Sequence, residues 1–319
     1  VLTPVGALIA NRLLPAEKER WQNVTKAKNL MALREGQERD QLALEEVVLG
    51  RLLNIDLDSE EGLRETSPEI KSLVKIGIEA TSRVVLYASE TADGIVCARI
   101  VREFVRRHWQ CTAAMEVITG LQVENAGRFR SVGAQNYVRS VVGEVNDPNN
   151  RYGYQIILNA TAGFKALVPY TTLIGLLFQV PVQYIFESSS TLLTLPPLPV
   201  GFDEVFIQRV MPLLEQLERE TALPEQEVLK NLSAEERDQL LPLLEPDTGQ
   251  YTLSTLGIIA HARYKPTPPL LPSRRRPEEK DHTRDYSQEP HRTNEFEKFK
   301  ECLAQCQWVD GFRYQKGAD

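Results

Sequence analysis

Short apolar runs alternate with longer amphipathic segments along roughly the first two hundred residues of the chain. The runs fall at residues 1–5, 83–88, 114–118, 155–158 and 182–187. They are rich in β-branched residues and bounded by turn residues, which predicts strands buried on both faces. The longer segments between them have the period of helices. This alternation predicts an α/β fold, with a mostly parallel sheet and helices on both of its faces.

The predicted helices differ in how they relate to the sheet. Residues 17–33, 39–54 and 60–79 are charged and amphipathic, and we expect them to form solvated helices inserted between the first two strands. Ser67-Pro68 suits a helix start within this insertion. Further helices are predicted after the second and third strands, at residues 95–109 and 129–145. The first of them carries a polar face that we expect to be solvated, formed by Arg99, Arg102, Arg106 and Arg107.

A second, smaller domain is predicted after the proline-rich stretch that begins at Leu195. Its expected elements are helices at 201–220, within 224–244 and at 255–264, with a hairpin wing at 251–257. Such an order is typical of a small helical or winged-helix-like connector. The segment is acidic from 215 to 247, which favours a dimerising connector over a DNA-binding module. The predicted domains are therefore 1–197, 198–265 and a linker with a further segment at 266–319.

The turn after the fourth predicted strand carries the clearest candidate chemistry. Small residues from Asn159 to Gly163 break the apolar run, and a helical pattern starts at Phe164 with Lys165 in its first turn. The first N–H groups of a helix lack internal partners and attract anions. Small residues let a ligand approach the backbone closely. The sequence thus predicts an anion-binding loop, although an ordinary strand-to-helix turn is also compatible with these residues.

Other polar or small residues stand where predicted strands end. They are Gly6, Ser89 and Glu187, in addition to Asn159. The carboxyl ends of parallel strands meet at one edge of a sheet, where ligands bind near the switch point in strand order. We therefore expect these positions to converge on one binding site.

Composition narrows the class of ligand and partner. The formal net charge of −7 argues against a protein that coats long nucleic acid, but it is compatible with a small anion held locally. The chain has no G-x-G-x-x-G, so dinucleotide binding is not expected. The four cysteines form no C-x-x-C pair, which favours reduced thiols in the cytoplasm over a zinc site. The uncharged stretch 166–186 contains two prolines and predicts a buried helix and strand rather than a membrane span.

Three segments together resemble one protein family. Asn159, Thr161, Gly163 and Lys165 match an N-x-T-x-G-x-K signature. Residues 3–11, TPVGALIAN, are similar to the family's first strand and loop, and residues 84–98, VVLYASETADGIVCA, to its second strand, turn and helix. The family is that of the CARF domains, the Rossmann-like sensors of type III CRISPR systems. The matches follow the family's order along the chain.

The resemblance implies a homodimer that senses a cyclic oligoadenylate second messenger, with cyclic tetra-adenylate as the expected ring and no cofactor, metal or membrane. Lys165 is expected to neutralise a phosphate that the turn backbone cradles. The implied ligand-binding residues are Gly6, Ala7, Asn11, Ser89, Thr91, Asn159, Thr161, Ala162, Gly163, Lys165 and Glu187. Ala7 and Leu8 stand where the family usually carries hydroxyl residues, which weakens the alternative that this loop cleaves the ring.

Residues 266–319 resemble, loosely, the start of a RelE-type toxin. This implies a ligand-activated ribonuclease in the full-length protein, acting on messenger RNA or the ribosome. The later basic strands of that fold are absent from this sequence, so we expect the segment to be truncated and to hold no catalytic residue. Arg276 and His282 fit the R-x4-6-H spacing of HEPN ribonucleases, but Pro277 does not suit the helix which that motif needs. A ring nuclease and a ligand-responsive transcription regulator remain as alternatives.

Overall fold

The computed structural model describes residues 1–6, 13–25, 35–122, 125–186, 191–230 and 232–265. The chain divides into two compact units, Val1–Tyr264 and Lys265–Asp319. The RelE-like segment 266–319 and the pair Arg276 and His282 lie outside the described residues. The predicted boundary between 197 and 198 falls inside the first unit and stays a prediction.

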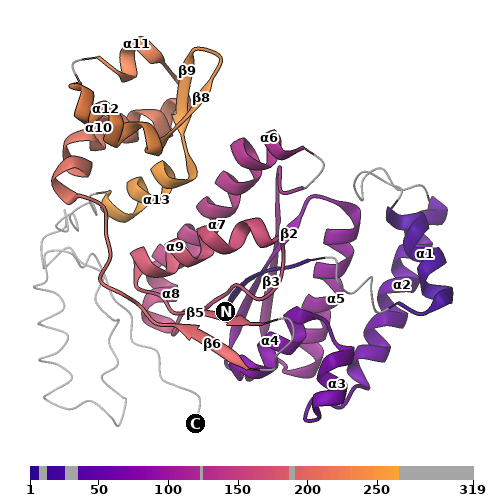
Figure 1. Cartoon of the computed structure of the whole chain (residues 1–319). Helices are drawn as coiled ribbons and strands as arrows, with labels where there is room; N and C mark the ends of the chain where they lie inside the picture. The colour runs from indigo at the N-terminus through magenta and orange to yellow at the C-terminus, as the bar shows by residue number, and fades with distance from the viewer. Residues whose placement is uncertain (7–12, 26–34, 123–124, 187–190, 231, 266–319) are drawn as a thin grey trace, which may run out of the picture. The chain divides into compact units, whose positions relative to one another are not determined.

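A six-stranded sheet with the order β3-β2-β1-β4-β5-β6 forms the centre of the first unit (Figure 1). Strands β1 to β5 run parallel, and β6 pairs antiparallel with β5 at the edge. The bounds are β1 Leu2–Pro4, β2 Arg83–Ser89, β3 Thr112–Ile118, β4 Leu158–Asn159, β5 Val182–Ile185 and β6 Leu192–Leu195. From β1 the following strands β2 and β3 are added on one side, and from β4 the strands β5 and β6 are added on the other. The switch point in strand order therefore lies between β1 and β4. The predicted mostly parallel α/β fold is confirmed.

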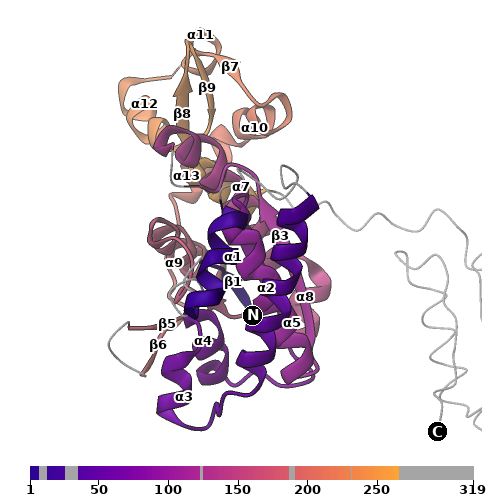
Figure 2. The same cartoon turned by 90° about the vertical axis from the view of Figure 1, so that its right-hand side faces the viewer.

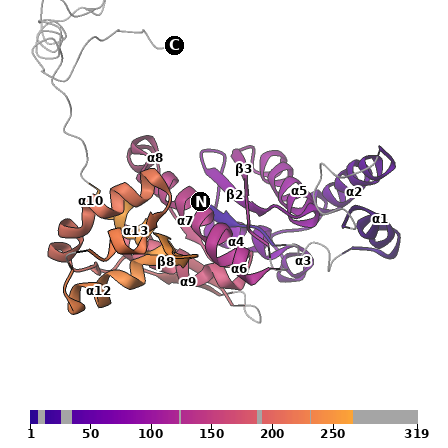
Figure 3. The same ribbon diagram turned by 90° about the horizontal axis from the view of Figure 1, so that it is seen from above.

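Helices cover both faces of this sheet, as β2 shows. Val84, Leu86 and Ala88 enter a core shared with the helices that precede β2 and with α5, while Val85 and Tyr87 enter the core on the other face. This alternation is the two-residue period of a strand. On the first face α1 packs on α2 and α2 on α5 (Figure 3). The bounds are α1 Pro15–Thr25, α2 Glu35–Leu53, α3 Glu60–Glu65, α4 Pro68–Ile76, α5 Ala92–His108, α6 Ala126–Arg128, a π-helical turn Phe129–Gly133, α7 Ala134–Asn146, α8 Pro148–Gly153 and α9 Val168–Phe178.

The insertion contains a break that the predicted single helix 60–79 lacked. Helix α3 ends at Glu65, and α4 begins at Pro68. Ser67 caps α4, since its Oγ accepts a hydrogen bond of 3.3 Å from the N–H of Ile70. A capping serine followed by proline starts a new helix, so these two residues divide the segment.

The predicted strand 155–158 is wrong in its extent, because β4 is only Leu158–Asn159. Helix α8, which Asp147 caps, immediately precedes this segment. Gln155, which follows α8, is exposed. The chain joins the sheet near Ile157, whose carbonyl accepts a hydrogen bond of 2.9 Å from the N–H of Leu2. Strand β6 was not predicted. Its residues are mostly exposed, as suits an edge strand with one solvated side.

The C-terminal part of the first unit has the element order of a winged helix. Two strands follow three helices and form a hairpin wing, and the small sheet has the order β7-β9-β8. Figure 2 shows this sheet with helices α10 and α12 beside it. The bounds are α10 Glu204–Glu220, β7 Leu223–Pro224, α11 Glu225–Val228, α12 Ala234–Leu240, β8 Leu244–Asp247, β9 Gln250–Leu253 and α13 Thr255–Tyr264. Helix α13 packs on α7 and α10. The predicted winged-helix-like order of elements is present, but the hairpin wing predicted at 251–257 is wrong in its bounds, because it is formed by β8 and β9 and ends at Leu253.

The uncharged stretch 166–186 forms a 3₁₀ turn, helix α9 and strand β5, as the helix-and-strand interpretation expected. Across the described ranges, no helix combines the length and the apolar character that a membrane crossing requires.

Candidate functional site

The loops after β1 and β4 touch at the switch point. Gly163 has a φ of +82°, a conformation that glycine adopts far more easily than other residues. A Cβ atom at this position would lie 2.6 Å from the Cβ of Pro4. A Cβ atom on Gly6 would lie 3.4 Å from the nitrogen of Gly163. Glycine at 163 therefore lets the β4 loop curl back onto the end of β1.

The side chain of Asn159 points into the protein and supports this loop, so it does not face the ligand side. The side chain is fully buried, and its Nδ2 donates to Thr3 Oγ1 at 3.1 Å and to Ser72 Oγ at 2.7 Å. Its Oδ1 accepts from the N–H of Thr161 at 3.1 Å. Since both ends of the amide have partners inside the protein, the structure makes Asn159 a scaffold for the loop.

Thr161 and Lys165 take different positions on the same loop. The Oγ1 of Thr161 accepts from the N–H of Ile185 at 3.0 Å and so ties the loop to the end of β5. Lys165 is exposed and begins a 3₁₀ turn, Lys165–Leu167, that precedes α9. The expected placement of Lys165 in the first turn of an α-helix is thus wrong by one turn. Pro169 explains the delay, because a residue without an N–H fits the first turn of α9.

A cavity of about 510 Å³ opens beside this loop. Its lining contains part of the predicted set, namely Thr161, Ala162, Gly163 and Lys165. Tyr184, Ile185 and Phe186 add an apolar side at the end of β5. The volume lies within the usual range of ligand pockets, roughly 300–1,000 Å³.

The opposite wall of the cavity comes from the insertion, which the sequence had predicted to be only solvated helices. Arg64 of α3 and Lys71 of α4 line it, together with Leu63, Thr66 and Pro68. Three cationic side chains and no acidic one are found among the described residues of the lining. This local charge suits an anion even though the whole chain is negative. No spacing in the sequence signals this wall, since it arises from how α3 and α4 pack against the sheet edge.

Helix α4 is hydrogen-bonded to both loops of the switch point. Glu69 is fully buried, and its Oε1 accepts from the N–H of Gly6 at 2.8 Å. Its Oε2 has no hydrogen-bond partner in the described part of the chain. Burial raises the pKa of this carboxyl above its ordinary value. Ser72, one turn further along α4, accepts the bond from Asn159 that ties the helix to the β4 loop.

Ser89 and Thr91 lie at the end of β2 but not among the residues that line the cavity. Their hydroxyls are 2.7 Å apart. Thr91 is the N-cap of α5, and its Oγ1 accepts from the N–H of Gly94 at 3.4 Å. Thr91 therefore starts α5, and the hydroxyl of Ser89 is bonded to this capping residue. Three further predicted site residues, Ala7, Asn11 and Glu187, lie outside the described residues.

Two of the arginines of α5 lie close to acidic groups of α2. Arg99 lies 3.8 Å from Glu45 and Arg107 lies 3.7 Å from Glu46, both on α2. The expectation of a solvated helix face is consistent with these partly exposed pairs.

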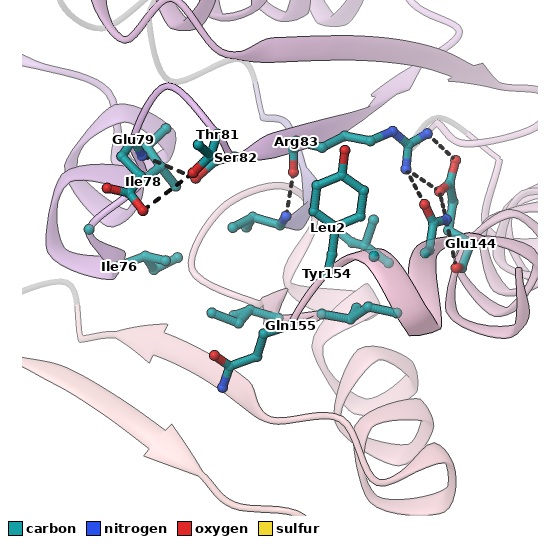
Figure 4. A pocket seen from close by; sticks show the side chains of 16 residues that line it. Leu2, Ile76, Ile78, Glu79, Thr81, Ser82, Arg83, Glu144, Tyr154 and Gln155 are labelled. Carbon is teal, nitrogen blue, oxygen red and sulfur yellow. Dashed lines mark hydrogen bonds and ion pairs between the residues drawn. The ribbon is translucent and has the colours of Figure 1, made fainter. Parts of the chain in front are cut away.

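A second cavity, of about 400 Å³, lies at the amino ends of the strands (Figure 4). Arg83 points toward Glu144 there, and their side chains form two hydrogen bonds of 2.5 and 3.0 Å. This bonding to Arg83 holds the pKa of Glu144 below its ordinary value. The guanidinium of Arg83 is thus already engaged by a carboxylate in this cavity.

The chain thus has a Rossmann-like fold with a cationic cavity beside the switch point of its sheet. Residues 64–198 match the model of a family described as a CRISPR-associated protein, Cas_APE2256. The match agrees with the resemblance to a CRISPR-associated family that the sequence motifs indicated. It includes the end of α3, α4, the signature loop and β5, and thus most of the cavity lining.

Comparisons with curated sequences and with solved structures leave this family match as the main similarity. No curated protein sequence matches the chain. Among solved structures, the chain is similar to Can2 from Sulfobacillus thermosulfidooxidans in complex with cyclic tetra-adenylate. The identity is 14%, the TM-score is 0.28, and the match covers 62% of this chain and 61% of that one. The chain thus spans less than two thirds of that relative's length, and a likeness of this degree carries no conclusion about what this chain binds.

Proposed function

We propose that this chain is the sensor part of a CRISPR-associated antiviral-defence effector and that it binds cyclic oligoadenylate, with cyclic tetra-adenylate as the expected ring. One observation carries the proposal. The N-x-T-x-G-x-K loop borders a cavity of about 510 Å³ whose described lining is cationic. The family match over residues 64–198 supports the same class of protein.

In this proposal the loop binds a phosphate of the ring. Lys165 supplies the charge, and the backbone of residues 161–163 lies within the same wall of the cavity. Gly163 keeps the loop folded onto the end of β1. Asn159 and Thr161 hold the loop in place through the bonds described above. A loop that is already held in place loses little conformational freedom when it binds an anion.

A ring of identical nucleotides suits a two-fold dimer. Each subunit would present the same Lys165 and the same loop to one half of the ring, which matches the symmetry of the ligand to that of the protein. We therefore expect a homodimer that binds one ring per two chains. Light scattering combined with the stoichiometry of a titration measures this directly, and a monomer that binds one ring per chain contradicts it.

Binding is proposed to activate a C-terminal ribonuclease of the full-length protein, with messenger RNA or the ribosome as its partner. Helix α9 starts next to the loop, and its Thr171 Oγ1 lies 2.7 Å from the hydroxyl of Tyr137 on α7. Helix α7 in turn packs on α13, the last helix of the connector. A ligand acts through such contacts only if it binds two arrangements of them with different affinity. Residues 1–319 alone are expected to cleave no RNA, with or without the ring.

The transcription-regulator alternative is disfavoured by the connector. In a winged helix the helix before the wing reads DNA, and here that helix, α12, has the sequence AEERDQL. Its Glu236 pairs with Arg209 at 2.6 Å, so a cation of α10 is also neutralised there. An acidic reading helix repels the phosphate backbone that supplies most of the affinity for DNA.

Isothermal titration of the purified chain with cyclic tetra-adenylate and cyclic hexa-adenylate tests the proposal. Linear tetra-adenylate serves as the control, because it carries the same bases without the closed ring. We expect saturable binding of a cyclic ligand. The absence of binding for both rings contradicts the proposed function. Chromatography of the mixture after incubation separates a sensor, which leaves the ring intact, from a ring nuclease, which releases linear products.

A further inference from the structure

We propose that α3 and α4 form a second binding wall, in which Arg64 and Lys71 contact a phosphate other than the one bound by Lys165, and that Tyr184 and Phe186 take up a base between the two walls. This inference rests on the proposed function and specifies it. It assigns part of the recognition to the insertion between β1 and β2, for which the sequence had indicated only solvated helices.

The positions of the cations support two separate phosphate contacts. Arg64 lies in the last turn of α3, Lys71 on α4, and Lys165 in the turn before α9. These three elements surround one cavity of about 510 Å³. A single phosphate group is much smaller than a cavity in the range of whole-ligand pockets. Cations spread over separate walls therefore fit a ligand with several anionic groups, as an oligonucleotide ring has.

The remaining surface of the cavity suits a base. The rings of Tyr184 and Phe186 are 6.3 Å apart between centroids and meet edge to face at 80°. Phe186 is 56% exposed, which is unusual for a side chain of its size. Bases stack on aromatic rings of this kind with little dependence on sequence. Leu63 and Pro68 add apolar surface from the insertion.

Helix α4 is held firmly enough to act as a wall. Its buried Glu69 and Ser72 are bonded to Gly6 and Asn159, which belong to the two loops of the switch point. A residue of the insertion thus contacts each loop, and Lys71 lies between these two anchors in the sequence. The second wall and the signature loop are therefore fixed relative to each other before a ligand arrives.

The test measures the affinity for fluorescently labelled cyclic tetra-adenylate in Arg64→Ala, Lys71→Ala and the double variant. We expect each single change to weaken binding about tenfold, as for the loss of one charge-assisted contact. Lys75→Ala is the matched control. It removes the same charge from the same helix, one turn further on, where Lys75 pairs with Glu60 at 2.8 Å outside the cavity lining. This control is expected to bind like the unaltered chain.

Two further measurements separate direct contact from a structural effect. Each phosphate contact that is lost should reduce the dependence of affinity on salt concentration. Arg64→Lys keeps the charge and should recover most of the affinity. Phe186→Leu, which keeps apolar bulk but not the ring, should weaken binding without changing the salt dependence. Urea unfolding confirms that each variant is folded, as expected from the exposure of Arg64 and Phe186.

The outcomes distinguish the two proposals. If Lys165→Ala weakens binding while Arg64→Ala and Lys71→Ala bind like the Lys75→Ala control, the second wall is overturned and the proposed function stands. If the unaltered chain binds no cyclic oligoadenylate, both are overturned. Equal weakening by Lys75→Ala also overturns the second wall, since the effect would then come from overall charge.

Discussion

Substitution of Gly163 by alanine tests the geometry on which the site depends. The change adds one methyl group where two features oppose it. The φ of +82° disfavours any residue with a Cβ, at a cost of about 1–2 kcal/mol. The new atom would also stand 2.6 Å from the Cβ and 3.0 Å from the Cγ of Pro4, and overpacking of this kind costs about 1–3 kcal/mol. The proline ring is rigid, so it cannot move aside as a flexible side chain would.

Together these terms predict that Gly163→Ala lowers the free energy of unfolding by about 2–5 kcal/mol. Urea unfolding followed by tryptophan fluorescence measures this loss, since Trp21 and Trp109 pack against the core around α5. The midpoint should fall while the slope of the transition is unchanged. Gly143→Ala is the matched control. It lies within α7 with no atom near the new methyl group, so a gain of about 1 kcal/mol is expected.

A double-mutant cycle separates the two terms. Pro4→Gly removes the atoms that the new methyl group would meet, so combining it with Gly163→Ala should recover the steric part of the loss and leave the part due to φ. A Gly163→Ala chain that is as stable as the unaltered one would refute this reasoning. It would show that the β4 loop does not fold onto β1 as described, and the proposed cradle would lose its basis.

Three other changes give further predictions. Burial raises the pKa of Glu69. The folded state therefore binds the proton of this carboxyl more tightly than the unfolded state does. The free energy of unfolding should fall as pH rises from the unfolded pKa of about 4.3 through the folded pKa. Glu69→Gln should abolish this fall and be more stable than the unaltered chain at neutral pH. Urea midpoints measured between pH 4 and 8 test this, and a variant with the same pH profile as the unaltered chain would contradict the assignment of the fall to Glu69. Tyr137→Phe loses the bond to Thr171 and should cost about 0.5–1.5 kcal/mol in the same assay, whereas an unchanged midpoint would show that this bond contributes nothing. Thr91→Ala should cost about 1 kcal/mol through loss of the α5 cap while leaving ligand affinity unaltered; a tenfold loss of affinity would instead make Thr91 a ligand contact.

Much of the fold could be predicted because its signals are local. The buried run at β2, the periodic helix α5 and the capping serine before α12 each depend on neighbours in the chain. The alternation of such elements was enough for the parallel sheet. The predicted bounds of strands were wrong, or a strand was missed, where the local sequence signal was weak or absent. Strand β4 is only two residues long, and β6 is an exposed edge strand without an apolar alternation that marks a buried face.

The site was predictable only in part, for a different reason. The signature loop could be found because its residues are adjacent in sequence, and its Gly163 has a positive φ, a conformation that glycine adopts readily. The role of Asn159 could not be predicted from the sequence, because its partners Thr3 and Ser72 are distant in the chain. Arg64 and Lys71 look like ordinary residues of solvated helices. Only the packing of α3 and α4 at the sheet edge brings them to the cavity.

The most direct test of the central claim is the affinity of Lys165→Ala for cyclic tetra-adenylate, compared with that of Lys75→Ala, which removes the same charge outside the cavity. We expect the first change to weaken binding by about 1.5–3 kcal/mol, or roughly tenfold to somewhat above a hundredfold, because it removes a charge-assisted phosphate contact. The second should have no measurable effect. A folded Lys165→Ala chain that binds the ring as tightly as the unaltered protein would contradict the assignment of this loop as the phosphate-binding site.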